Sequence, residues 1–266
     1  MSDARPITRM EYWNAMWQRI PALSPIDPHK GGLRNYAYRH LHQIFARALA
    51  TENPKGKRLI EIGCAGSRWL AYFHQFHGCQ ISGIDYSQPG CAATQQLLNR
   101  LGIPGDILQE DMFNPSPDHL DKYDIVFSNG LVEHFTNTAG AIAACAAFLK
   151  PGGLMITLVP NMTGPLGRLQ RLFDRPLYEK HVPLSREQLA QAHADAGLEV
   201  LDAHYALLAH LGVIQFGAIE RIIGSRPLQA LKLALSAPLW ALGPLMGLRP
   251  NRLTSPFVLC LSRKPG

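Results

Sequence analysis

A short apolar run, followed at once by a glycine turn and a helical pattern, constrains this chain more than any other segment. Residues 58–62 read Arg-Leu-Ile-Glu-Ile, which predicts a short buried parallel strand with one acidic side chain near its end. Gly63 and Gly66 then mark a tight turn, and Ser67 can cap a helix over residues 69–76. Strand, glycine turn and helix form the first half of a nucleotide-binding α/β unit, in which a ligand approaches the backbone closely.

The glycine spacing does not fit two common nucleotide-binding motifs. A dinucleotide turn needs Gly-x-Gly-x-x-Gly, but these positions hold Gly63, Ala65 and Arg68, and the Gly-Lys-Ser/Thr of a P-loop is absent. The turn resembles motif I of the class I S-adenosylmethionine (SAM) dependent methyltransferases, acidic-x-Gly-x-Gly-x-Gly. Glu61 and Gly63 match that motif, and the residues at 64–67 are all small. Taken alone, the segment could also be an ordinary strand-to-helix turn.

Later segments follow the order of motifs in the same family. Residues 81–87 predict a second strand ending in Asp85, about 20 residues after the turn, where a carboxylate can accept both ribose hydroxyls. Capping of the next helix is the alternative role for Asp85. The resemblance implies that Tyr86 packs on the adenine. It also implies that Asp111 accepts from the adenine amino group, with Met112 against the ring.

The matches continue through a fourth and a fifth strand. Residues 122–135 resemble the family's fourth strand and following loop, with its Glu-His-Phe segment, and 149–158 begin a fifth strand with Lys-Pro-Gly-Gly. The chain is therefore identified as a member of the class I SAM-dependent methyltransferases of small-molecule type, over about Arg58 to Asn161. The resemblance implies SAM as cofactor and, at its site, Glu61, Gly63, Cys64, Ala65, Gly66, Asp85, Tyr86, Asp111, Met112, Asn129 and Gly130.

The alternation of strands and helices predicts a doubly wound, Rossmann-like α/β sheet with ligands beyond the carboxyl ends of its strands. The resemblance adds that the sheet has seven strands, mainly parallel, with the last one antiparallel. We expect N-terminal helices over 1–50, which pack on the core or cover the site as a lid. A SAM-binding core over 51–207, an apolar helical insertion over 208–250 and a last core strand within 251–266 complete the organisation.

Two histidines are the candidate catalytic residues. His134 follows the fourth strand, where the methyl group is expected, and His181 lies in the linker after the fifth strand. An imidazole has an ordinary pKa near 6.5, which suits proton removal, although a structural role in the loop is the alternative for both. We expect Tyr12, Trp13, Tyr36, Glu133, Asn161 and Tyr178 to contact the acceptor. The sequence shows no cluster at metal-ligand spacing, so we expect no metal.

The charge and the cysteine content limit which partners and which cell compartment we expect for this chain. The net charge of +6 comes from scattered Lys and Arg, so we expect a small-molecule acceptor and no nucleic acid. An RNA methyltransferase, and a protein that binds SAM without methyl transfer or for another reaction, remain the alternatives. Five cysteines without Cys-x-x-Cys spacing indicate reduced thiols and a cytoplasmic protein, and charges within residues 1–20 argue against a secretory signal.

The insertion over 208–250 is unusually apolar. Its most apolar part, 233–248, has sixteen uncharged residues, fewer than the about 20 that a spanning helix needs. Apolar surface of this density is normally buried against something. We therefore expect the insertion to cap the substrate, to form a homodimer interface, or to contact a membrane peripherally through 227–250. A hydrophobic or lipid-linked acceptor would fit this segment.

Overall fold

The computed structural model describes residues 5–243 and 245–266, with the backbone alone at 218 and 221. Residues 1–4 of the predicted N-terminal segment and residue 244 of the predicted insertion lie outside that description. The strands form one sheet in the order β3-β2-β1-β4-β5-β7-β6. They are β1 Arg58–Ile62, β2 Gln80–Asp85, β3 Gly105–Gln109, β4 Tyr123–Asn129, β5 Leu149–Pro160, β6 Glu199–Ala206 and β7 Phe257–Arg263.

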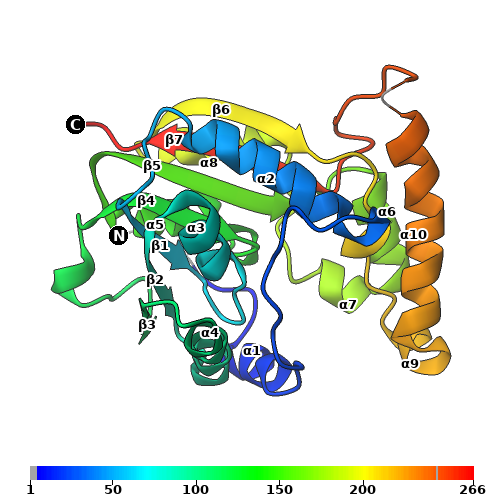
Figure 1. The fold of residues 1–266 in the computed structure, drawn as a ribbon, viewed down its shortest axis with the longest axis horizontal. Coiled ribbons are helices and arrows are strands. Elements are labelled where there is room, and N and C mark those ends of the chain that lie inside the picture. Colours follow the sequence, from blue (N-terminus) through cyan, green and yellow to red (C-terminus); the bar gives the residue numbers. More distant parts are fainter. Residues whose placement is uncertain (1–4, 244) are drawn as a thin grey trace.

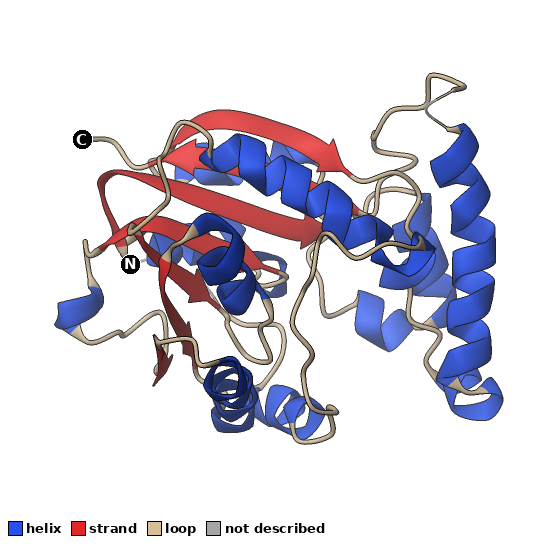
Figure 2. Ribbon diagram, in the orientation of Figure 1, coloured by secondary structure: helices blue, strands red, loops and turns tan. Residues whose placement is uncertain are grey.

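The strand directions confirm the predicted fold class. Strands β1 to β5 pair in parallel, and β7 runs antiparallel to both of its neighbours, β5 and β6. Helices cover both faces of this sheet (Figures 1 and 2). They are α1 Met10–Trp17, α2 Tyr36–Leu49, α3 Trp69–His77, α4 Gln88–Leu101, α5 Thr138–Ala146, α6 Pro165–Phe173, α7 Arg175–Tyr178, α8 Arg186–Asp195, α9 Ala218–Ile223 and α10 Ser225–Leu242.

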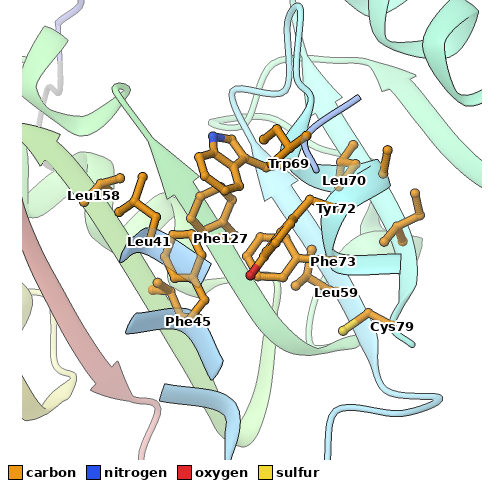
Figure 3. Packing of buried hydrophobic residues seen from close by; sticks show 14 of the residues in the cluster. Leu41, Phe45, Leu59, Trp69, Leu70, Tyr72, Phe73, Cys79, Phe127 and Leu158 are labelled. Atoms are coloured by element: carbon orange, nitrogen blue, oxygen red, sulfur yellow. The ribbon is translucent and has the colours of Figure 1, made fainter. Parts of the chain in front are cut away.

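The two faces of the sheet carry separate hydrophobic cores. On one face, residues of α2 and α3 pack against β1 and β4, including Phe45, Tyr72 and Phe127 (Figure 3). On the other face, residues of α5 and α8 pack against the alternate side chains of the same strands, among them Ile60 and Val126. Because both sides of the central strands β1 and β4 are buried, their sequences are largely apolar, as the residues of β1 indicated.

Local sequence signals explain where several helices begin. Ser185 caps α8 in a capping box with Gln188, and the Ser87 hydroxyl accepts the Gly90 N–H at the start of α4. The expected role of Ser67 needs correction, because α3 begins at Trp69 with Arg68 at its N-cap.

The other boundaries shift by a few residues. Tyr12, Trp13, Met16, Trp17 and Ile20 recur at roughly helical spacing and give the first helix an aromatic face, but this helix stops at Trp17. The Lys-Pro-Gly-Gly segment lies at the start of β5, as expected, and there the register between β4 and β5 shifts and Gly152 adopts a positive φ of 76°.

The predicted insertion joins β6 to β7 and lies at the right edge of Figure 1. It contains a 3₁₀ turn, Leu211–Val213, followed by α9 and α10. One side of α10 is fixed to the rest of the chain. Trp240 stacks on Tyr36 with ring centroids 4.1 Å apart, and its indole N–H donates to the Leu208 carbonyl at 2.8 Å. Within the described ranges, none of the helices combines the length and apolar character needed to cross a bilayer.

Candidate active site

A cavity of about 490 Å³ lies beyond the carboxyl ends of β1, β2, β4 and β5. The strand order reverses between β1 and β4, and ligands of open α/β sheets bind at such a switch point. Helix α1 contributes Tyr12, Trp13, Met16 and Trp17 to its wall. The cavity is therefore bounded by strand ends and by the segment that the sequence suggested as packing or a lid.

Glycine is required at two positions of the turn after β1. Gly63 and Gly66 have φ values of 81° and 62°, a region that side chains other than glycine rarely adopt. A Cβ on Gly66 would lie 2.3 Å from a ring atom of Trp17, and one on Gly63 would lie 3.1 Å from Leu131. The missing side chains let Trp17 and Leu131 pack directly against the backbone of the turn.

Glu61 and Ser67 form a hydrogen-bonded pair beneath this turn. The Ser67 hydroxyl donates to the Glu61 carboxylate and accepts the N–H of Trp69 at 3.0 Å. Burial raises the pKa of Glu61 to about 8, an effect reinforced by the nearby charge of Asp85. The acidic residue of motif I thus links strand, turn and helix.

Asp85 occupies the end of β2, opposite the glycine turn. Its two carboxylate oxygens accept the N–H of Ala65 at 3.2 Å and the N–H of Ser87 at 2.8 Å. Burial raises its pKa, and these two bonds oppose that effect. A carboxylate has about four acceptor sites, so two remain for ligand hydroxyls. Tyr86 follows in the same wall.

These features fit SAM. A nucleoside with a free ribose needs a buried acceptor, a close backbone approach and a flat side chain, which Asp85, Gly66 and Tyr86 offer within one cavity. Asn129 and Gly130, directly after β4, complete the wall toward the acceptor side.

Three titratable side chains gather at the other end of the cavity: Glu133, His134 and His181. The first two lie on a 3₁₀ turn after β4, Val132–His134. The Val182 N–H donates to the Glu133 carbonyl at 2.7 Å, which brings the later loop against this turn. The rings of His134 and His181 are 4.5 Å apart, and Trp13 meets His134 edge-on at 4.9 Å.

Backbone carbonyls fix the tautomers of both histidines. His134 Nδ1 lies 2.7 Å from the Lys180 carbonyl, and His181 Nδ1 lies 2.8 Å from the Leu177 carbonyl. A carbonyl only accepts, so each Nδ1 carries the proton and each Nε2 keeps its lone pair in the neutral ring. Burial lowers the pKa of His134 to about 4, helped by the neighbouring His181 and Lys180.

The Glu133 carboxyl group is buried, and no hydrogen bond from another described residue offsets its loss of water. No other described residue donates a hydrogen bond to either of its oxygens, although a buried carboxyl normally has partners. Burial consequently raises the pKa of Glu133 to about 8. Its Oε1 lies 3.9 Å from His134 Nε2, which is beyond hydrogen-bond reach.

The same three side chains form a group that the sequence did not indicate as a metal-ligand cluster, because His181 follows 47 residues after His134. One ligand atom from each lies within 4.8 Å of the others. Imidazole and carboxylate are common zinc ligands, so this group could hold a metal ion. The Lys180 ammonium, which lies over the Tyr12 ring at 4.7 Å, adds a positive charge nearby.

Most of the site residues suggested by the sequence meet in this cavity. The cavity wall includes Glu61, Gly63, Ala65, Gly66, Asp85, Tyr86, Asn129, Gly130, Tyr12, Trp13, Glu133, His134 and His181. They come from four strand ends, from α1 and from the loop before α8.

Three expected cofactor residues lie elsewhere. The Cys64 side chain points under the turn toward Gly83, where an added Cβ would be 2.7 Å from its sulfur. Met112 is buried in the core on the α5 and α8 face. Asp111 is exposed and accepts the N–H of Phe113 at 3.0 Å, closing a local turn. None of the three belongs to the cavity wall.

Three expected acceptor residues also lie outside the wall. Tyr36 stacks on Trp240 of α10, as described above. The Asn161 amide donates to the carbonyls of Arg252 and Ser255, both at 2.9 Å, and so holds the segment before β7. Tyr178 ends α7, and the Arg171 guanidinium lies over its ring at 5.9 Å. None of the three belongs to the cavity wall.

Other residues of the cavity wall were not among the site residues expected from the sequence. Trp17 was included in the aromatic face of the first helix, and this was the only signal for it. Lys180, Gln170, Val213 and Gln215 come from α6, from the loop before α8 and from the insertion. Their positions depend on tertiary packing, and no motif marks them.

A Rossmann-like sheet with a glycine turn and a buried acid at the end of the second strand defines a nucleoside-binding α/β domain. The methyltransferase-domain family model matches residues 33–203, which is more than half of the chain. The protein belongs to this family.

Curated relatives of similar sequence are ubiquinone biosynthesis O-methyltransferases. The protein from Marinobacter nauticus is 31% identical over 108 residues, which cover 40% of this chain and 45% of the relative. The protein from Rhodopseudomonas palustris is 29% identical over 158 residues, or 57% of each chain. The chain thus spans about half the length of the curated relatives it matches.

Solved structures share the fold over nearly the whole chain. The [4+2]-cyclase SpnF has a TM-score of 0.62 at 18% identity, covering 96% of this chain and 93% of its own. Geranyl diphosphate C-methyltransferase from Streptomyces coelicolor A3(2), solved with Mg²⁺, geranyl diphosphate and S-adenosyl-L-homocysteine, has a TM-score of 0.59 at 13% identity, covering 98% of this chain and all of its own. At these identities the likeness concerns the fold.

Proposed function

We propose that this protein transfers a methyl group from SAM to a hydroxyl oxygen of a small, largely apolar acceptor. The observation that carries the proposal is the cavity itself, with cofactor-type residues at one end and one buried and one half-buried imidazole at the other. The relatives named as ubiquinone biosynthesis O-methyltransferases support an oxygen acceptor. When bound, SAM would supply an electrophilic methyl group, so the protein mainly has to align the acceptor, exclude water and remove a proton.

The chain's own residues divide this work between them. Asp85 and the glycine turn would hold the nucleoside, and Tyr86 would pack on its base. At the acceptor end, His134 is the proton acceptor, because its Nε2 carries a free lone pair and its lowered pKa keeps it neutral at pH 7. His181 lies beside it with the same tautomer. It is the second candidate base.

Apolar side chains favour an apolar acceptor. Tyr12, Trp13 and Met16 of α1, Phe135 after β4 and Val213 of the insertion all contribute to the wall. Such a lining excludes water and buries an aromatic or aliphatic body, while the few polar groups orient the reactive atom. Since α1 covers the cavity without a single fully buried residue of its own, it is suited to act as a lid.

The decisive experiment measures product formation with a panel of hydroxylated aromatic compounds, with and without an apolar tail. We expect a methylated acceptor and equimolar S-adenosylhomocysteine. His134→Gln should lower kcat at saturating acceptor by about a hundredfold, the usual contribution of a positioned general base. His204→Gln, on the half-exposed edge of β6, is the control and should leave kcat unchanged.

Three results would separate the alternatives. SAM binding without transfer to any acceptor would favour a SAM-binding protein of another function. If His134→Gln turns over at the wild-type rate, His134 shapes the loop and is not the base. Methylation of RNA, with affinity that falls steeply with salt, would replace the small-molecule acceptor.

A further inference from the structure

The outward side of α10 is apolar to a degree that a water-facing helix does not normally show. Between residues 230 and 242, every exposed residue is Ala, Leu or Pro. Leu231, Leu235, Leu239 and Leu242 follow one another at helical spacing and are 42% to 56% exposed. A helix with one face in water carries polar or charged side chains on that face. This face therefore has a partner other than water.

The apolar surface continues beyond both ends of the helix. Ile222 and Ile223 of α9 precede it, with exposed fractions of 84% and 53%. Leu245 and Met246 follow it, at 85% and 70%. Together with the α10 leucines they form what we call the outer face; α10 itself lies at the edge of the molecule, beyond the sheet (Figure 1).

The helix cannot bury its outer face by turning inward. Its inner side is held by directional bonds: the Ser236 hydroxyl accepts the Leu211 N–H at 3.2 Å, and the Lys232 ammonium donates to the Ile214 carbonyl at 2.6 Å. The Trp240 indole is bonded and stacked as described above. Rotation would break these contacts and leave buried polar groups without partners.

Positive charge predominates around the outer face, although α9 also carries Glu220, whose negative charge acts on Lys232. Residues 221–256 include no Asp or Glu, and their basic residues are Arg221, Arg226, Lys232, Arg249 and Arg252. Of these, Arg226 near the start of α10 and Arg249 and Arg252 after its end are exposed. An apolar stripe flanked by exposed cations is the pattern of a helix that lies in the plane of a membrane interface.

We propose that the outer face docks on the surface of an anionic phospholipid bilayer, with α10 lying in the interface. A second copy of the chain fits the outer face less well than a lipid surface does. A two-fold contact would place this basic segment against itself, with no acid of the segment to complement it. An anionic lipid surface complements it directly. The docked helix would stand next to the cavity, because Ile214, bonded to Lys232, lies between the wall residues Val213 and Gln215.

Co-sedimentation with vesicles tests this surface without any methyl transfer. The full chain should pellet with vesicles of equal parts phosphatidylglycerol and phosphatidylcholine, and far less with phosphatidylcholine alone or in high salt. Leu235→Glu combined with Leu239→Glu should lower the vesicle partition at least about tenfold, because it places charge in the apolar contact. Leu201→Glu, at an exposed position of β6, is the control and should bind as the wild type does.

A second variant keeps the apolar stripe and removes only charge. Arg226→Gln combined with Arg249→Gln should lower binding to the anionic vesicles by about fivefold for each arginine, with little change on neutral ones. Circular dichroism would show that each variant is folded.

Two outcomes would overturn the proposal. One is equal pelleting of the wild type and the double glutamate variant, or no pelleting at low salt. The other is a wild-type dimer in solution that Leu235→Glu with Leu239→Glu converts to a monomer, which would assign the outer face to a second copy.

Discussion

Replacement of Glu133 by glutamine should make the protein markedly more resistant to alkaline unfolding. In the native state burial raises the pKa of this carboxyl group from 4.5 to about 8. The native state therefore retains a proton that the unfolded chain releases above pH 4.5, so stability is lost progressively as the pH rises toward 8. Glutamine has nearly the same shape and cannot ionise, so the variant lacks this loss.

The size of the effect follows from the pKa difference. Between pH 6 and about pH 8 the unfolded chain has released the proton and the native state has not. Two pH units at about 1.4 kcal/mol each give about 2 to 3 kcal/mol of stability that the wild type loses and Glu133→Gln keeps. Any cost of burying the amide is the same at both pH values, so it cancels when the pH dependences are compared.

Urea unfolding of both proteins at pH 6 and pH 9 measures this difference directly. Glu199→Gln, at an exposed position of β6, controls for the change of side chain. If Glu133→Gln and the wild type lose the same free energy of unfolding between the two pH values, the carboxyl is not held protonated. The account of an uncompensated buried acid at the acceptor end of the cavity would then be wrong.

Three further predictions concern the cofactor and the question of a metal. Asp85→Ala should weaken SAM binding at least about tenfold in calorimetry, because the ribose hydroxyls lose a charged acceptor, and unchanged affinity would refute that role. Gly66→Ala should destabilise the protein more than Gly102→Ala, since both glycines have similar positive φ values but only Gly66 faces a ring atom of Trp17. Equal losses in thermal unfolding would show that this contact carries no cost. Methyl transfer should survive EDTA treatment, because the methyl group of SAM is already electrophilic and needs no Lewis acid; a loss of activity that Zn²⁺ or Mn²⁺ restores would show that Glu133, His134 and His181 hold a metal.

The sequence by itself determined the fold and brought most of the expected cofactor residues into one cavity, with Cys64, Asp111 and Met112 outside its wall. The first strand is a short apolar run followed directly by Gly63, and the second ends in Asp85. These signals are local, so they can be seen without knowing what lies across the sheet. The capping serines at 87 and 185 likewise place two helices almost to the residue.

Tertiary structure decided the acceptor end. His181 reaches His134 only because the Val182 N–H bonds the Glu133 carbonyl, and no spacing in the chain encodes that contact. The same holds for Tyr36, whose partner Trp240 lies about 200 residues away, and for Asn161, which holds the segment before β7. A side chain's role at this end depends on which distant segment packs against it, and that is a property of the folded chain.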